Sequence, residues 1–99
     1  SAVTVAPSYR RLGMAQSLMD DFEKLCIQTY DAYFVDLFVR ASNILAQNMY
    51  TQFGYSTYRR VIGYYNGVDS EDALDMRKAL PRDKNKRSVI PLDRPVYPH

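Results

Sequence analysis

A short basic stretch near the start of the chain carries the residue types that can hold a phosphate group. Arg10 and Arg11 supply positive charge, and Gly13 lets a ligand approach the backbone because it has no Cβ. The stretch follows residues 3–5, whose side chains alternate as in a half-buried strand. It opens a helix predicted over residues 13–29, so free amides and the positive end of the helix dipole fall there. These features predict an anion site, although an ordinary basic helix start also fits them.

The elements that must position this stretch read as one small α/β unit. Along residues 13–29, side chains at helical spacing predict one stripe that faces the core. It consists of Ala15, Leu18, Met19, Phe22, Leu25, Cys26 and Thr29. Glu23 is predicted to lie off this stripe. Residues 33–39 are almost continuously apolar, which is typical of a strand covered on both faces in a parallel sheet. Strand, helix and strand in this order predict a right-handed crossover. Asp36 interrupts the second strand, either as a paired structural carboxylate or as a polar group in a cleft.

A second helix is predicted over residues 44–53. Ser42 or Asn43 can cap its start, and Gly54 just past its last turn is a common helix end. Its predicted core face consists of Leu45, Ala46, Met49, Tyr50 and Phe53. A strand is expected next, over residues 55–62, because tyrosine and β-branched residues are frequent there.

The last third of the chain is less regular. A loop is predicted from Gly63 to Gly67, and it carries two adjacent tyrosines. Residues 71–80 have a composition that favours a helix, but several of their side chains also alternate in polarity as in a strand. From Pro81 onward, prolines alternate with basic residues, which predicts an extended tail that follows the surface or a partner.

Composition limits the classes of function. The chain has 99 residues, enough for one small core, and a net charge of +2, too low to argue for nucleic acid. It has no apolar run that could span a bilayer and no Cys/His spacing typical of a metal site. Its single cysteine, Cys26, is expected to be a buried thiol in a reducing compartment. We therefore expect neither a membrane segment, nor a bound metal, nor a nucleic-acid partner.

Two motifs in the chain resemble the GNAT acetyltransferase family. Arg10-x-x-Gly13-x-Ala15 resembles the family's acetyl-CoA pyrophosphate turn, and the segment from Asn43 to Tyr55 resembles its second conserved helix. More narrowly, residues 34–40, the tyrosine pair, residues 71–80 and residues 88–92 resemble the NatB group of catalytic subunits. The resemblance implies an α/β GNAT fold in its C-terminal portion: a mixed sheet with two helices, the first strands missing, and a strand at residues 71–80. It divides the chain into a partial acetyltransferase domain (1–80) and a Pro-rich basic extension (81–99).

The resemblance also implies roles for individual residues. Acetyl-CoA, the implied cosubstrate, would contact Val3, Val5, Arg10, Arg11, Leu12, Gly13, Met14, Ala15, Asn43 and Tyr50. Tyr50 and Asn43 would be catalytic, with the Tyr50 hydroxyl protonating the leaving thiolate and Asn43 holding the pantetheine arm. Tyr64 and Tyr65 would line the entrance for the acceptor peptide. Phe38 stands where related enzymes carry a histidine, so the base is either a tyrosine acting through water or the solvent.

By resemblance, the expected reaction is acetyl transfer to the N-terminal amine of nascent chains that start with Met followed by Asp, Glu, Asn or Gln. An auxiliary NatB subunit, the ribosome and a cytoplasmic location are implied with it. Another GNAT activity, NatA-like or on small molecules, and a non-catalytic GNAT fragment that acts as a binding piece stay open as alternatives. If the sheet starts at residues 2–6, the backbone groups along the outer edge of that strand are unpaired. Such an edge predicts self-association or low stability of the isolated chain.

Overall fold

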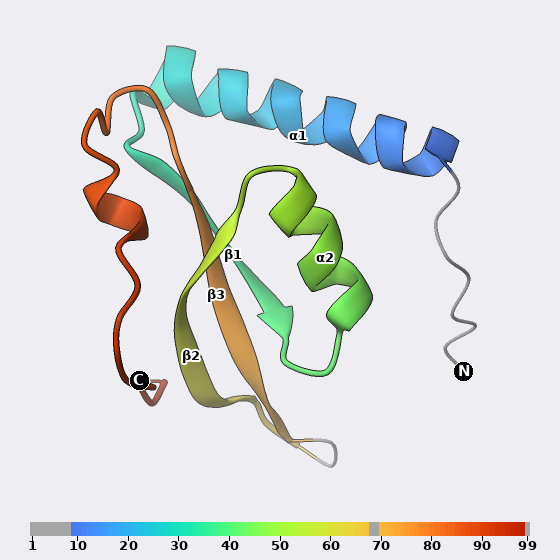
Figure 1. Cartoon of the computed structure of the whole chain (residues 1–99), viewed down its shortest axis with the longest axis vertical. Coiled ribbons are helices and arrows are strands. Elements are labelled where there is room, and N and C mark those ends of the chain that lie inside the picture. Colours follow the sequence, from blue (N-terminus) through green and yellow to red (C-terminus); the bar gives the residue numbers. More distant parts are fainter. Residues whose placement is uncertain (1–8, 68–69, 99) are drawn as a thin grey trace.

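A computed structural model describes residues 9–67 and 70–98 of the chain. The elements in chain order are α1 (Tyr9–Tyr30), β1 (Phe34–Arg40), α2 (Ile44–Gln52), β2 (Ser56–Tyr65), β3 (Glu71–Ala79) and the short 3-10 helix η1 (Arg87–Val89). In Figure 1, α1 crosses one end of the sheet, α2 lies beside the strands, and the C-terminal segment follows β2 on the other side. This arrangement of two helices and a small sheet confirms the predicted α/β class.

The three strands form one antiparallel sheet in the order β1-β3-β2. β1 pairs with β3 along its whole length, from Phe34 opposite Ala79 to Arg40 opposite Ala73. β2 pairs with the other side of β3, so β3 is the central strand. Within the described ranges, no strand lies along the outer edge of β1. The parallel strand that would make the sheet mixed is predicted at residues 3–5, which lie outside the described residues.

β3 confirms the strand that the family resemblance implies for residues 71–80, against the helix that their composition favours. Leu74 and Met76 face the helices, whereas Ala73 and Asp75 face the other side of the sheet. A central strand has neighbours on both sides, and these contacts outweigh the intrinsic helix propensity of Glu, Ala, Leu, Met and Lys.

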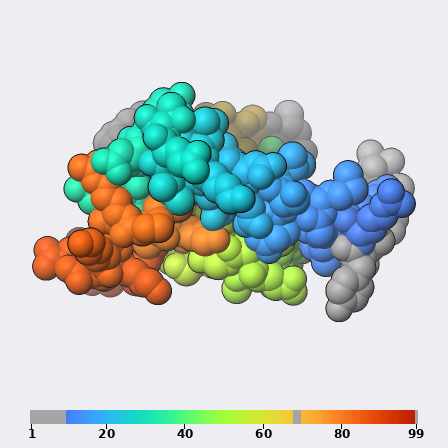
Figure 2. Space-filling model, turned by 90° about the horizontal axis from the view of Figure 1, so that it is seen from above, coloured from blue at the N-terminus to red at the C-terminus, as the bar shows by residue number. Residues whose placement is uncertain are grey.

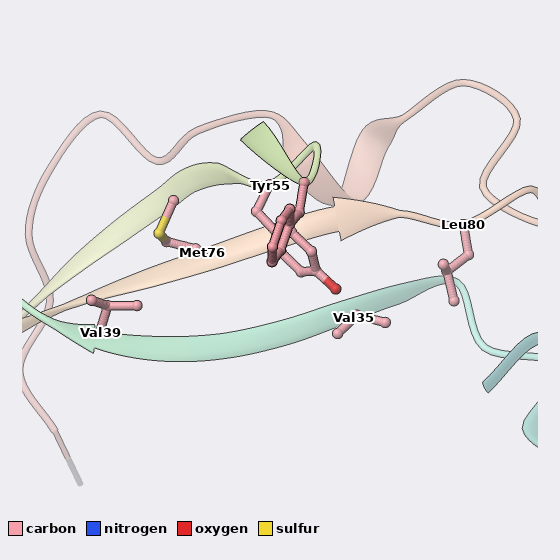
Figure 3. Packing of buried hydrophobic residues seen from close by; sticks show 6 residues of the cluster. Val35, Val39, Tyr55, Met76 and Leu80 are labelled. Carbon is pink, nitrogen blue, oxygen red and sulfur yellow. The ribbon is translucent and has the colours of Figure 1, made fainter. Parts of the chain in front are cut away.

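The hydrophobic core lies between the sheet and both helices. The buried cluster consists of Val35, Val39, Phe53, Tyr55, Met76 and Leu80. Figure 3 shows this cluster from close by, with Val35, Val39, Tyr55, Met76 and Leu80 labelled. The helices contribute Ala15, Met19 and Cys26 from α1 and Ala46, Met49 and Tyr50 from α2. The two helices therefore cover the same face of the sheet, and Cys26, predicted to be buried, is partly buried there.

α1 differs from its predicted form in its bounds and in its buried face. The helix is recorded from Tyr9, four residues before the predicted start. Of the predicted stripe, Leu18, Phe22 and Leu25 are 69%, 48% and 49% exposed, so their assignment to the core is wrong within the described part of the chain. Figure 2 looks down on α1 and shows most of this helix uncovered. The helix carries two adjacent apolar stripes, and the sheet covers only the one that contains Met19.

Glu23, predicted to lie off the core stripe, is buried. Its side chain accepts a hydrogen bond from the Tyr55 hydroxyl at 2.9 Å and pairs with the Lys78 ammonium at 2.8 Å. Burial and this hydrogen bond raise the pKa of Tyr55. The network joins α1, the segment after α2, and β3, and it satisfies the buried carboxylate on both oxygens.

The other face of the sheet is aromatic and charged. The Arg77 guanidinium lies between the rings of Phe34 and Tyr58, at 4.3 and 3.6 Å from their centroids. Asp36 and Arg40 of β1 point to this face, where their side chains are 30% and 48% exposed. On this face of β1, Phe34 and Phe38 are partly buried, and Asp36 is the charged exception that the sequence indicates.

Two boundaries also differ from prediction. β2 continues to Tyr65, so the predicted loop beginning at Gly63 is in fact strand with an irregular register between Val61 and Tyr65. Gly63 has φ +63°, a left-handed value that suits glycine at such an irregularity. α2 ends one residue earlier than predicted, and Leu45, assigned to its core face, is 42% exposed.

Candidate active site

The start of α1 presents the residues predicted to hold a diphosphate. α1 begins at Tyr9, so the described amides without an acceptor inside the helix are those of residues 9–11. Gly13 to Ala15 follow in the next turn of the helix, so all six residues from Arg10 to Ala15 lie in the first two turns of α1. A Cβ added at Gly13 would meet no heavy atom within 4 Å. The glycine is therefore not required by packing in the described chain, which fits a surface kept open for a ligand.

α2 positions the two predicted catalytic residues, Asn43 and Tyr50. Asn43 is the N-cap, and its side-chain oxygen accepts from the Ala46 N–H at 3.1 Å. Tyr50 lies seven residues further on, so both sit on one side of the helix, about 10 Å apart along its axis. The capping role of Asn43 is thus observed, and any contact with pantetheine would come in addition to it.

Glu71 of β3 connects the start of α2 to the sheet through hydrogen bonds. Its carboxylate accepts from the Ser42 hydroxyl at 2.9 Å and from the Ser42 N–H at 3.2 Å. It also pairs with Arg40 at 3.5 Å. The two hydrogen bonds from Ser42, with Arg40 adding to them, hold the pKa of Glu71 below its ordinary value. The position of Asn43 therefore depends on a residue of β3, which the sequence pattern does not reveal.

Tyr50 packs against the core through its ring. The ring makes edge contacts with Phe53 and Tyr55, at centroid distances of 6.3 and 5.8 Å. No described residue hydrogen-bonds the Tyr50 hydroxyl. The ring is held in place while the hydroxyl keeps its hydrogen-bonding capacity, as a proton donor to a ligand needs.

The predicted substrate tyrosines lie on the opposite face of the sheet from Tyr50. Tyr64 stacks on Phe38 with ring centroids 4.7 Å apart and planes 7° apart. Tyr65 meets Tyr64 edge-on at 5.1 Å, and the Arg40 guanidinium lies 4.1 Å from the Tyr65 centroid. The structure thus joins both tyrosines to Phe38, the position that bears on the choice of base.

A buried carboxylate lies beside this aromatic group. Asp75 is fully buried and accepts from the Arg59 Nε–H at 2.7 Å, while Arg77 lies 4.0 Å from its other oxygen. Asp36 pairs with Arg77 at 3.7 Å. Burial raises the pKa of Asp36, and Arg77 and Arg59 partly oppose that shift. Asp36 is therefore a paired carboxylate, the first of the two alternatives left open by its position in the strand, and it does not line the pocket described next.

A pocket of about 430 Å³ opens over these residues. It is lined by Phe38, Arg59, Val61, Tyr64, Val96, Tyr97 and Pro98. Arg59 and the C-terminal residues were not predicted as site residues. The alternation of β2 could have placed Arg59 on this face, but a long-range contact with the tail leaves no local sequence signal.

The described site residues fall into two groups on either side of β1. On the helix face lie Asn43, Tyr50 and the start of α1, and on the other face lie Tyr64 and Tyr65. Val3 and Val5, predicted to contact the pantetheine arm, lie outside the described residues. Tyr50 and the aromatic pocket are therefore separated by the sheet.

A metal cluster or a membrane-spanning helix would point to other classes of protein. Across residues 9–67 and 70–98, no cluster of three or more His, Cys, Asp or Glu side chains could hold a metal ion. None of the helices in these ranges combines the length and the apolar character needed to cross a membrane.

The chain is similar to several known proteins. The chain is 65% identical over 98 residues to N-alpha-acetyltransferase 20 of Dictyostelium discoideum, covering 99% of this chain and 56% of that protein. It is 57% identical to the NatB catalytic subunit NAA20 of Arabidopsis thaliana, with 99% and 55% covered. The crystal structure of Chaetomium thermophilum Naa20 with a bisubstrate analogue superposes with a TM-score of 0.78 at 42% identity, covering 98% of this chain and 55% of that one. The chain thus spans about half the length of these relatives.

A family model gives the assignment. The model described as an acetyltransferase (GNAT) domain matches residues 1–80, which include the start of α1, all of α2 and the three strands. The chain belongs to the GNAT acetyltransferase family.

Proposed function

We propose that the chain carries the catalytic residues of a NatB-type N-alpha-acetyltransferase, which moves an acetyl group from acetyl-CoA to the N-terminal amine of a polypeptide. The observation that carries the proposal is the division of the site across β1. Asn43 and Tyr50 lie with the start of α1 on one face, and an aromatic pocket lies on the other. Identities of 65% and 57% to the N-alpha-acetyltransferases named above support this assignment.

The proposed mechanism is direct transfer within a complex of both substrates. The diphosphate would rest on the first amides of α1, with Arg10 and Arg11 adding positive charge. The neutral amine attacks the thioester carbonyl, so that a C–N bond forms and the C–S bond breaks. Tyr50 would protonate the leaving thiolate. Cys26 takes no part as a nucleophile in this scheme, because it packs against the core from α1.

Removal of the amine proton needs no strong base here. Phe38 cannot accept a proton, and its ring is stacked on Tyr64. An N-terminal α-amine has a pKa of about 8, so a useful fraction is already neutral at physiological pH. The amine proton leaves either directly to solvent or through a tyrosine and a water molecule. These are the same two routes that the sequence leaves open.

The proposed acceptors and partners follow the same relatives. Two solved structures similar to this chain at 49% and 46% identity are of the NatB acetyltransferase complex, bound to CoA and MES and to a bisubstrate inhibitor. We propose acceptor chains that begin with Met followed by Asp, Glu, Asn or Gln, an auxiliary subunit, and action on nascent chains in the cytoplasm.

The test is acetylation of synthetic peptides that differ only in their first two residues, followed by mass spectrometry. We expect acetyl-CoA-dependent modification of Met-Asp and Met-Glu peptides and none of peptides that begin with Ser or Ala. Preference for Ser or Ala, or for a polyamine, would assign another GNAT activity. A chain that does not bind acetyl-CoA would instead be the non-catalytic binding piece.

A further inference from the structure

We infer that the C-terminal segment of this chain, residues 96–98, forms the far wall of the acceptor site and selects the fourth or fifth residue of the acceptor peptide. The inference rests on the proposed function, because it takes the pocket over Phe38 and Tyr64 as the acceptor site. It assigns a role in substrate choice to the extension that follows the family match at residues 1–80.

The segment is held in a defined place beside β2. The Leu92 N–H donates to the Tyr58 carbonyl at 2.7 Å, and the Val96 N–H donates to the Arg60 carbonyl at 2.9 Å. The Val96 carbonyl accepts from the Ile62 N–H at 2.8 Å. Val96 thereby forms a parallel bridge with Val61, and the segment acts as a short additional strand. Figure 1 shows it running along β2 toward the C-terminus.

The side chains of this segment complete the pocket. Phe38 and Tyr64 line one part of it, and Val96, Tyr97 and Pro98 line another. Tyr97 is 73% exposed, so most of its ring surface can be covered by a ligand. Among the described residues of the lining, Arg59 alone carries a formal charge, and Asp75 already pairs with its guanidinium. An apolar side chain therefore suits this part of the pocket better than a charged one.

The distance across the sheet sets which acceptor residue reaches the segment. The spatial order of the strands is β1-β3-β2, and the C-terminal segment follows beside β2. Three spacings of about 4.8 Å give about 14 Å from β1 to this segment. An extended peptide advances about 3.3 Å per residue, so about four residues cover this distance. With its N-terminal amine at the edge of β1, the peptide brings its fourth or fifth residue to Tyr97.

The test compares peptides with leucine or glycine at positions 4 and 5 and a constant Met-Asp start. For Tyr97→Ala in the full chain, we expect KM for the leucine peptide to rise about tenfold, with kcat and KM for the glycine peptide unchanged. Tyr30→Ala is the matched control, because Tyr30 is 72% exposed and lies at the end of α1, outside the pocket. Equal KM values for Tyr97→Ala and the unsubstituted chain would overturn the inference.

A binding measurement makes the inference independent of turnover. The chain has no tryptophan, so Tyr97→Trp introduces a single fluorophore at the pocket. We expect a saturable emission change with the leucine peptide, and none for Tyr30→Trp. If the emission of Tyr97→Trp does not change with the peptide, but the variant acetylates that peptide normally, the role of the segment is refuted and the proposed function is not. Absence of any acetyl transfer, with the emission change present, would instead refute the proposed function.

Discussion

At Gly13 we expect one substitution to stabilise the fold and to weaken ligand binding. It lies inside α1, where glycine is about 1 kcal/mol less favourable than alanine, and nothing within 4 Å would oppose a methyl group. We expect Gly13→Ala to raise the free energy of unfolding by up to about 1 kcal/mol and to weaken acetyl-CoA binding. Chemical denaturation and calorimetric titration measure the two effects. Gln28→Ala, at an exposed position of α1, is the control for helix propensity. Undiminished affinity in Gly13→Ala would show that the phosphates bind elsewhere.

Tyr50 is the residue on which the proposed chemistry depends most. Phenylalanine keeps the edge contacts with Phe53 and Tyr55 and removes only the hydroxyl. We therefore expect Tyr50→Phe to lower kcat about a hundredfold with little change in acetyl-CoA affinity or in melting temperature. Single-turnover acetylation and calorimetry separate the two quantities. If kcat is retained, the thiolate is protonated by another group.

For single residues, the sequence predicted roles that depend on near neighbours in the chain better than burial and pairing that depend on distant residues. The helix cap at Asn43 has a local signal, because a capping side chain and its amide partner lie three residues apart. The burial of Glu23 has none, since its partners Tyr55 and Lys78 are distant in the chain. The alternation of β2 could have placed Arg59 on the pocket's face, but its pairing with Asp75 of β3 has no local signal. Pairs that form across the sheet are invisible to a reading of neighbouring residues.

At the scale of elements, long-range contacts decided where local propensity was ambiguous. α2 could be predicted to within one residue because its cap and its terminal glycine are local features. β3 has the composition of a helix but forms a strand because it pairs on both sides. Its composition and its alternation pointed to different structures, and the family resemblance decided for the strand. The two apolar stripes of α1 could not be ranked from sequence, because either could face the sheet.

The junction between β3 and α2 makes a prediction about acid sensitivity. The folded-state pKa of Glu71 lies below its ordinary value of 4.5, so its contribution to stability is complete above that pH and is lost as pH falls through the folded pKa. We expect the melting temperature of Glu71→Gln to fall less than that of the unsubstituted chain between about pH 5 and pH 3. At neutral pH the variant should be the less stable one. Parallel pH profiles of the two melting temperatures would contradict this role of Glu71.

At the scale of the whole molecule, α1 carries an exposed apolar stripe on the side that faces away from the sheet, which we call the outer stripe. Met14, Leu18, Phe22 and Leu25 are exposed by 60%, 69%, 48% and 49%. The chain also spans about half the length of its curated relatives. Exposed apolar surface of this kind promotes association between molecules.

The stripe can be tested with two substitutions one residue apart. We expect Leu18→Lys to change the free energy of unfolding by less than about 0.5 kcal/mol and to reduce self-association. Met19→Lys, which directs the same charge into the core, should be far more destabilising. Denaturation curves and sedimentation velocity measure the two properties. Similar destabilisation by both variants would mean that the outer stripe is covered.

The most direct test of the whole account is a calorimetric titration of the chain with acetyl-CoA, repeated with Gly13→Asp. We predict one binding site per chain and, for Gly13→Asp, no detectable binding by a variant that melts as a folded protein, because a carboxylate would stand against the phosphates. At a ligand concentration of about one hundred times the dissociation constant, the unsubstituted chain should gain about 2.7 kcal/mol in stability. Equal affinity in the two proteins, or no binding by either, would contradict the account.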